Sequence, residues 1–200
     1  LVFSIKQTAV PAGLLLAGLL GPPLAEWVGW RATMLAAAAV CVVLALVLQP
    51  LRERFDDDRV PTRAFRLSDF RTTLAAVLAT RELRTLSYAC LVFNGLQTVM
   101  TAYFVVYLTT LGYTPVAAGF LFSVAMAVAV PGRILWGWIG SSYVSPRLTM
   151  GGLAIGMAGS AALLAFASAE WPTLLVALVA CALSLTALSW HDLLLAETAH

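Results

Sequence analysis

The chain has 200 residues, of which 61% are hydrophobic and only 11% charged, and its formal net charge is +2. Soluble domains carry about 25% charged residues, so this chain has too few to cover a surface that faces water. The mean hydropathy of +0.91 points to a lipid bilayer as the surrounding solvent, and the small net charge excludes nucleic acid as an expected partner.

Six apolar runs are long enough to cross a bilayer, which takes about 20 mainly apolar residues in a helix. Helices are predicted because none of the runs alternates in the way that a membrane β-strand does. The predicted spans are Ser4–Ala25, Trp30–Leu48, Leu83–Leu111, Pro115–Gly140, Leu148–Ala167 and Pro172–Leu195. The sequence therefore predicts an all-α fold, a polytopic membrane helical bundle with six transmembrane helices.

The basic residues orient these spans, because cytoplasmic connections carry an excess of Lys and Arg. Lys6 lies at the start of the first span, the interval Gln49–Arg84 contains eight basic residues, and Arg147 follows the fourth span. The intervening connections have one basic residue, Arg31, or none. We predict a multi-pass protein of the cell (plasma or inner) membrane, with residues 49–84 and both ends of the chain cytoplasmic.

The polar interval after the second span contains a helical pattern of its own. Ser68 is a suitable N-cap, and Phe70, Leu74, Val77 and Leu78 then fall on one face of a helix. We predict a short amphipathic helix that lies on the cytoplasmic membrane surface.

Rows of small residues predict that the spans pack closely, because they let helix backbones approach each other in lipid. The first span contains Ala9, Gly13, Ala17, Gly21 and Ala25 at intervals of four, and the fourth span contains Ala125, Ala129 and Gly137 in the same register.

Arg133 lies in this row of the fourth span, roughly 12 Å from its cytoplasmic end at 1.5 Å per residue. An arginine at that depth is costly unless it reaches the headgroups or faces water or a counter-charge. One interpretation is that Arg133 extends to the inner headgroups beside Trp136 and Trp138. The other is that it lies in a water-filled cavity and binds an anionic group, which the row of small residues favours.

Four polar residues of the third span, Asn94, Gln97, Thr98 and Thr101, share one helix face, and Tyr103 lies on an adjacent line. Such residues can join helices by hydrogen bonds.

His191 and Asp192, near the end of the sixth span, are adjacent and therefore point to different sides of a helix. Either both lie at the cytoplasmic interface, or Asp192 carries a proton or pairs with an arginine.

Nothing in the sequence predicts an enzyme, a catalytic residue, a metal site or a cofactor. Cys41, Cys90 and Cys181 lie in three different apolar runs without metal-ligand spacing. Walker A, dinucleotide-binding and zinc-protease motifs are all missing from the printed sequence.

Several motifs resemble those of one transporter family, the major facilitator superfamily. SIKQTAVPAGLLLAGLLGPPLAEWVGWR resembles the fifth span and following loop of bacterial members, although Leu24 and Ala25 replace the two glycines of the antiporter motif. LGYTPVAAGFLFS is similar to the loop between spans seven and eight. GRILWGWIGSSYVSPR resembles the signature between spans eight and nine, with Ser141 and Ser142 in place of its charged pair. SWHDLLLAETA resembles the end of span ten.

The resemblance implies that the chain is a fragment covering approximately spans 5 to 10 of 12. Residues 1–50 would then be the last two helices of the N-terminal half-bundle, residues 51–82 the cytoplasmic central loop, and residues 83–200 the first four helices of the C-terminal half-bundle.

The resemblance also implies candidate substrate-binding residues. An arginine in the eighth span followed by x-x-x-Gly is similar to the monocarboxylate-type carriers, in which it serves the substrate anion. The seventh span lines the cavity in this family. Arg133, Asn94, Gln97 and Tyr103 are therefore candidate substrate-binding residues, and Asp192 and His191 are weaker candidates for proton coupling.

These observations together predict a secondary active transporter that moves a small solute, with an anion as one candidate, by alternating access. Its expected partners are a small-molecule substrate and the lipid bilayer, with a coupling proton as a further candidate. The alternative is the membrane subunit of a larger complex, such as an ATP-driven permease or a sensor.

Overall fold

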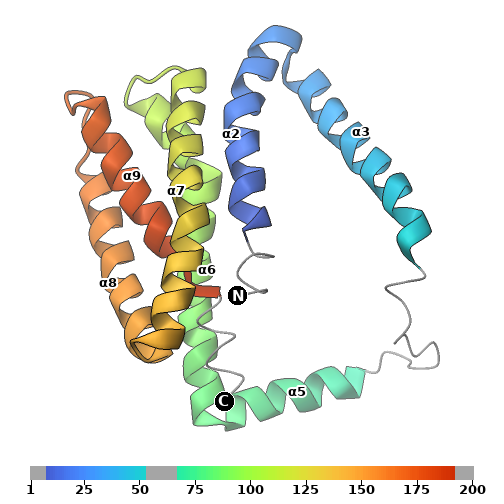
Figure 1. The fold of residues 1–200 in the computed structure, drawn as a ribbon, viewed down its shortest axis with the longest axis vertical. Coiled ribbons are helices and arrows are strands. Elements are labelled where there is room, and N and C mark those ends of the chain that lie inside the picture. The colour runs from blue at the N-terminus through green and yellow to red at the C-terminus, as the bar shows by residue number, and fades with distance from the viewer. Residues whose placement is uncertain (1–7, 53–66, 192–200) are drawn as a thin grey trace. The chain divides into compact units, whose positions relative to one another are not determined.

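The computed structural model describes residues 8–52 and 67–191, and within them all regular structure is helical, with no strand (Figure 1). Five of the described helices are long and apolar enough to cross a membrane. The predicted all-α membrane bundle is confirmed. The helices are α2 (Ala9–Val28), α3 (Trp30–Leu48), η1 (Gln49–Leu51), α5 (Leu67–Ala79), α6 (Arg81–Thr110), α7 (Pro115–Ser142), α8 (Pro146–Ala165) and α9 (Thr173–Ala187).

The last predicted span is the one that differs most from the structure. The sequence predicts it over Pro172–Leu195, of which residues 192–195 lie outside the described residues; α9 has 15 residues and ends at Ala187. A turn follows at Leu188 and Ser189 before the chain is helical again at Trp190. The Ser189 hydroxyl donates to the Leu185 carbonyl at 2.7 Å, a local bond of the kind that competes with regular helix geometry.

The chain forms two compact units, one of residues 1–23 and 88–200 and the other of residues 24–87. In the first unit, α9 packs against both α7 and α8. The buried core of this unit consists of apolar side chains from α6 to α9 and from the segment just after α9. Large contributions come from Phe93, Met100, Phe104, Leu108, Phe122, Met126, Leu153, Met157, Val176, Leu183, Leu188 and Trp190.

Hydrogen bonds from side chains to backbone carbonyls join the helices of the first unit. Ser184 of α9 is fully buried and donates to the Ala125 carbonyl of α7 at 2.7 Å. The Tyr107 hydroxyl of α6 donates to the Leu164 carbonyl of α8. These bonds satisfy polar groups that would otherwise be unpaired in an apolar surrounding, so they favour one register of the helices.

Helix α2 approaches α7 at a pair of glycines. A Cβ added to Gly119 would lie 2.5 Å from the Gly18 carbonyl oxygen and 2.6 Å from Pro22 Cγ. Beside this contact, the Ser123 hydroxyl of α7 donates to the Leu15 carbonyl of α2 at 2.8 Å. The absence of side chains at the two glycines therefore allows backbone-to-backbone contact between α2 and α7.

Among the described residues, the face of the first span that packs differs from the predicted row of small residues. A Cβ at Gly13 or Gly21 would meet nothing within 4 Å, whereas Pro11 and Gly18 are buried. Both faces of α2 carry small residues, and the face that packs is the one whose Gly18 meets Gly119. The complementary glycine on the partner helix decided the choice, and the spacing along α2 could not reveal it.

Glycines and prolines have different effects on the helices. The turn after α6 needs Gly112, whose φ of 93° is unfavourable for other residues, and Tyr113 N–H closes it by donating to the Leu108 carbonyl at 3.2 Å. By contrast, α2 continues through Pro22 and Pro23, and α7 continues through Pro131.

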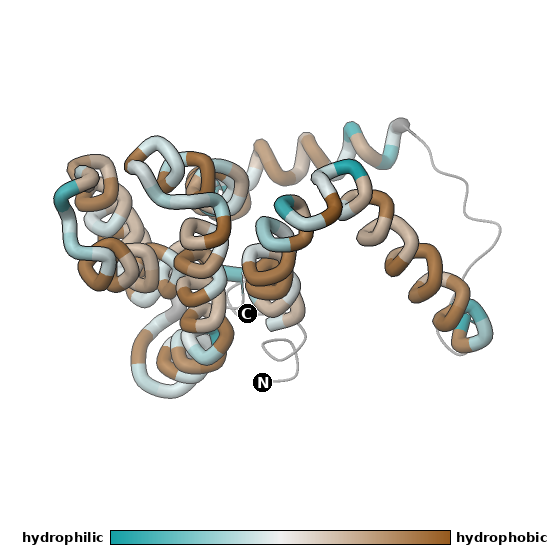
Figure 2. Tube along the Cα trace, turned by 90° about the horizontal axis from the view of Figure 1, so that it is seen from above, coloured by the Kyte–Doolittle hydropathy of each residue, from teal (hydrophilic) through white to brown (hydrophobic). Residues whose placement is uncertain are grey.

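In the second unit, α3 has no buried residue. Figure 2 shows that the middle of this helix is hydrophobic on every side, with polar residues near its ends. A helix that is apolar all round is stable where lipid or other helices surround it. Helix α5 in the same unit has its large apolar residues on one side, where Phe70, Leu74 and Leu78 lie within one sector and are exposed.

Candidate functional site

Arg133 lies on the packed face of α7. Ala125 and Ala129, one and two turns before it, are fully buried, and Arg133 itself is only 1% exposed. A side chain that extended into the headgroup region would be more exposed than this. The burial therefore favours the interpretation in which Arg133 lies inside the bundle, where an intramembrane arginine commonly marks the path of a solute or ion.

Aromatic and amide side chains from α6 and from the segment after α9 form a group next to this arginine. The Trp190 ring stacks on Phe93 with a centroid distance of 5.6 Å and on His191 with a centroid distance of 3.9 Å. Trp190 Nε1 donates to Gln97 Oε1 at 3.1 Å. The Arg133 charge lies close enough to act on the His191 imidazole. We call these five residues the arginine cluster.

The break in the helix after α9 forms part of this arrangement. Discontinuous helices are common at the binding sites of secondary transporters because the break aims side chains and backbone groups into a cavity. Here the turn at Leu188 and Ser189 separates Trp190 and His191 from the regular helix, and Trp190 contacts Phe93 and Gln97 of α6.

Two buried nitrogen atoms near Arg133 have no hydrogen-bond partner among the described residues, Trp136 Nε1 and His191 Nδ1. Trp136 follows Arg133 by three residues on α7, so the two side chains leave neighbouring faces of the helix. An indole N–H and a guanidinium can only donate, and an imidazole nitrogen can donate when protonated. A group of donors suits a ligand that supplies acceptors, such as a carboxylate or phosphate.

The structure brings only some of the predicted residues together. Gln97, His191 and Arg133 belong to the arginine cluster. Asn94 lies on the same helix as Gln97, and its side chain is exposed. Asp192 lies outside the described residues.

Tyr103 lies outside the arginine cluster and lines a separate groove. This groove lies between α6, α8 and α9, has a volume of about 340 Å³ and is also lined by Tyr107, Leu164 and Leu183. The Tyr107 hydroxyl is already engaged with the Leu164 carbonyl. The lining is almost wholly apolar and includes no charged residue within the described chain, so this groove by itself does not select an anion.

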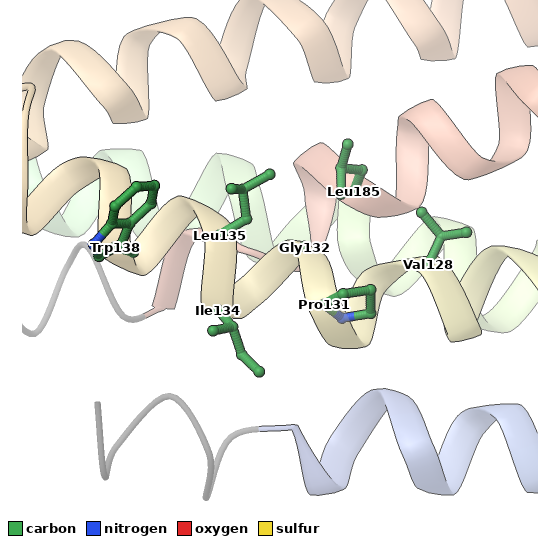
Figure 3. Close-up of a pocket in the computed structure, with 7 residues that line it drawn as sticks. All are labelled: Val128, Pro131, Gly132, Ile134, Leu135, Trp138 and Leu185. Atoms are coloured by element: carbon green, nitrogen blue, oxygen red, sulfur yellow. The ribbon is translucent and has the colours of Figure 1, made fainter.

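A second groove, of about 500 Å³, follows α7 in the segment that contains Arg133. Figure 3 shows its lining: Val128 and Leu135 of α7 point to the side of that helix on which Leu185 of α9 lies. Leu185 lies over Gly132, where an added Cβ would overlap Leu185 Cδ1. Arg133 does not line this groove, and its apolar walls suit hydrocarbon better than an anion.

Sequence reasoning missed two residues of this region, Trp190 and Trp136, as candidate site residues. The signal that could have found them is the indole N–H, which usually has a partner when the ring is buried. That signal does not identify the partner, because Gln97 and Trp190 are 93 residues apart in the chain.

No group of three or more His, Cys, Asp or Glu side chains that could hold a metal ion occurs within residues 8–52 and 67–191. The three cysteines are free thiols, at the exposed Cys41 and the half-buried Cys90 and Cys181.

The family relationship follows from comparison with known proteins. The family model described as Major Facilitator Superfamily matches residues 1–197, almost the whole chain. Neither a curated protein nor a solved structure matches the chain. Apolar helices of spanning length and interhelical packing through small residues accord with this match. The chain therefore belongs to the Major Facilitator Superfamily, a family of membrane transporters.

Proposed function

We propose that the protein is a secondary transporter that carries a small anionic solute across the cell membrane by alternating access, with the arginine cluster as its binding site. The observation that supports this most directly is the burial of Arg133 on the packed face of α7, inside the bundle. Family membership favours a secondary transporter over the subunit of an ATP-driven permease or a sensor.

Each residue of the proposed site has a distinct task. Arg133 supplies the positive charge and a planar pair of donors that match a carboxylate or phosphate. Trp190 holds the Gln97 amide through its indole N–H. Because Gln97 Oε1 accepts that bond, its NH₂ group remains as the donor for the solute. Asn94 and Tyr103 are proposed as solute contacts in other stages of the transport cycle.

The proposed orientation places residues 49–84 on the cytoplasmic side. Arg133 is then nearer to the cytoplasmic end of α7 than to its outer end. Asp192 and His191 are the proposed proton-coupling candidates, and the stacking of His191 on Trp190 makes His191 part of the arginine cluster.

The test begins with binding to the purified intact protein. Acetate, lactate and benzoate are titrated beside their uncharged amides, with tryptophan fluorescence as the signal because Trp190 belongs to the arginine cluster. The anion and not the amide should bind. Loss of a hydrogen bond to a charged group costs about 1.5–3 kcal/mol, so Arg133→Ala should weaken binding about 10- to 150-fold. Arg133→Lys, which keeps the charge but not the planar geometry, should fall between.

Flux into ATP-free proteoliposomes, corrected for leak into protein-free vesicles, then tests the transport step. Arg31→Ala is the matched control, because Arg31 is exposed and stacks on Trp30 instead of lying in the site. Normal anion binding and flux in both Arg133 variants would refute the proposed site. Flux that requires ATP or a partner protein would refute the secondary-transporter proposal.

A further inference from the structure

The indole N–H of Trp136 is a buried hydrogen-bond donor without an acceptor in the described chain. Trp136 lies on α7, and its ring packs against the buried core of the first unit. Its Nε1 atom is buried and has no hydrogen-bond partner among residues 8–52 and 67–191. Because a buried indole N–H usually has a partner, and an unpaired buried donor is unfavourable, this atom requires an acceptor that the described residues do not supply.

Other buried donors of the same unit are paired within the protein. Trp190 Nε1 donates to Gln97 Oε1 at 3.1 Å. The Ser184 hydroxyl donates to the Ala125 carbonyl at 2.7 Å. Trp136 is an exception to this pattern, and a buried polar group that stays unpaired in a native structure commonly has a functional reason.

Helix geometry places Trp136 beside Arg133. Trp136 follows Arg133 by three residues, so the two side chains leave α7 about 60° apart around the helix axis. A side chain on a helix covers the turn that precedes its own Cα atom, and the turn before Trp136 contains Arg133. Trp136 also shares this side of α7 with the fully buried Ala125 and Ala129, and it does not line the apolar groove along that helix. The two side chains therefore point into the bundle from neighbouring faces.

The indole decides that the missing partner is an acceptor. A second buried nitrogen without a described partner, His191 Nδ1, lies on the segment after α9. An imidazole nitrogen donates or accepts according to its protonation, so it adapts to either kind of ligand atom. An indole N–H can only donate, so the atom that Trp136 meets must accept a hydrogen bond.

The charges of the neighbouring helices favour an uncharged acceptor. Arg133 is the one charged residue of α7, and α9 has none. A second anionic group would be buried next to these two helices without a further counter-charge from them, which is unfavourable. A neutral acceptor needs no counter-charge, and one N–H group pairs with it.

We propose that Trp136 is a specificity-determining residue, and that the solute carries a second, uncharged hydrogen-bond acceptor in addition to its anionic group. This inference rests on the proposed function: Arg133 binds the anionic group, and the Trp136 N–H donates to the second acceptor of the same molecule. Ether oxygens, carbonyl oxygens and ring nitrogens are suitable acceptors. A solute with hydrocarbon in that place leaves the N–H buried and unpaired, so the site discriminates against it.

The test compares pairs of anions that bind to the purified intact protein, by isothermal titration calorimetry. Methoxyacetate is paired with butyrate, which has a methylene group in place of the ether oxygen. Picolinate, nicotinate and isonicotinate are each paired with benzoate, which has a carbon atom in place of the ring nitrogen. These three place the acceptor at different distances from the carboxylate. In the unaltered protein, at least one acceptor-bearing anion should bind about 2- to 12-fold more tightly than its hydrocarbon partner.

Trp136→Phe should remove this preference, because phenylalanine has no N–H group. Benzothienylalanine at the same position keeps both rings but has sulfur in place of Nε1, and it should remove the preference as well. The readout is the ratio of the two affinities within a pair, because a packing defect weakens both members alike. Trp138→Phe is the matched control, since it also removes an indole from α7, but that ring is half exposed and packs edge-on against Tyr143. The preference should persist in this control.

A preference that persists in both Trp136 variants would overturn the inference, and so would its loss in Trp138→Phe. Equal affinities within every pair for the unaltered protein would also overturn it, even where Arg133→Ala still weakens anion binding. The Trp136 N–H would then be paired by something other than the solute, such as a water molecule. Anion binding that does not depend on Arg133 would instead refute the proposed function, and this inference with it.

Discussion

The contact between α2 and α7 allows a sharp prediction about Gly119→Ala. The new methyl group would lie 2.5 Å from the Gly18 carbonyl oxygen and 2.6 Å from Pro22 Cγ, whereas ordinary contact begins at 3.4 Å. The nearest atom belongs to the backbone, so no side-chain rotation can relieve the overlap. The helices must separate by about 0.9 Å along that line, which forfeits a quarter to a half of the dispersion energy of the contacting atoms.

The magnitude follows from two opposing effects. Overpacking of this kind costs about 1–3 kcal/mol. Alanine in place of glycine within a helix returns about 0.5–1 kcal/mol, because the unfolded chain loses conformational freedom. Gly13→Ala, on the first half of α2, brings the same gain without the overlap, since a Cβ there meets nothing within 4 Å. The difference between the two variants therefore isolates the overpacking cost.

The assay is thermal unfolding of the purified intact protein in detergent, followed by tryptophan fluorescence. For a chain of this size 1 kcal/mol corresponds to about 2–4 °C, so Gly119→Ala should melt about 2–12 °C below Gly13→Ala. Gly18→Ala should fall between them, because its closest new contacts, at 2.7 Å, are to side-chain atoms of Phe122 and Ser123, and the nearest backbone atom, the Gly119 carbonyl oxygen, is 3.0 Å away.

Equal melting temperatures for Gly119→Ala and Gly13→Ala would refute the reasoning. The close approach of α2 to α7 would then not be part of the stable structure. An order in which Gly18→Ala is the least stable of the three would contradict the distinction between backbone and side-chain contacts.

Two further predictions concern the arginine cluster. Trp190→Phe keeps a ring to stack on Phe93 but removes the bond to Gln97; anion binding should weaken about 2- to 12-fold, corresponding to about 0.5–1.5 kcal/mol for one hydrogen bond. The double variant with Gln97→Met should bind no more weakly than the weaker single variant, since both residues act through one bond, and fully additive losses would exclude that coupling. His191→Gln should abolish the stimulation of flux by a pH gradient while exchange of solute across the membrane continues; stimulation equal to that of the unaltered protein would exclude His191 as the coupling group.

The positions of most helices were accessible from the sequence because they depend on local properties. The second span begins and ends at the predicted residues, Trp30 and Leu48, and α7 begins at the predicted Pro115. The length of an apolar run and the turn residues at its ends are enough for this, since every backbone group in lipid must be paired within its own helix. The end of α9 at Ala187 was not accessible, because neither glycine nor proline marks it.

The candidate site was only partly accessible for the same reason. The burial of Arg133 could be expected, since a charge at that depth and in a row of small residues has few alternatives. The pairing of Gln97 with Trp190 could not be expected from the sequence. Other polar residues near each of them could form a hydrogen bond equally well, and the sequence does not say which helices meet. Tyr103 shares a helix with Gln97 but lines another groove, which only the packing of α6 against α8 and α9 reveals.

Composition, run length and motif order are properties of a single chain, so they were enough to predict the lipid surroundings of this protein, its helical class and its family. The face of α2 that meets α7 and the side chains that join Arg133 became known from the packing of the helices. Both contacts depend on how the surfaces of two helices fit each other. The surface of one helix does not specify its partner, because the fit also depends on the glycines and hydrogen-bonding groups of the other helix.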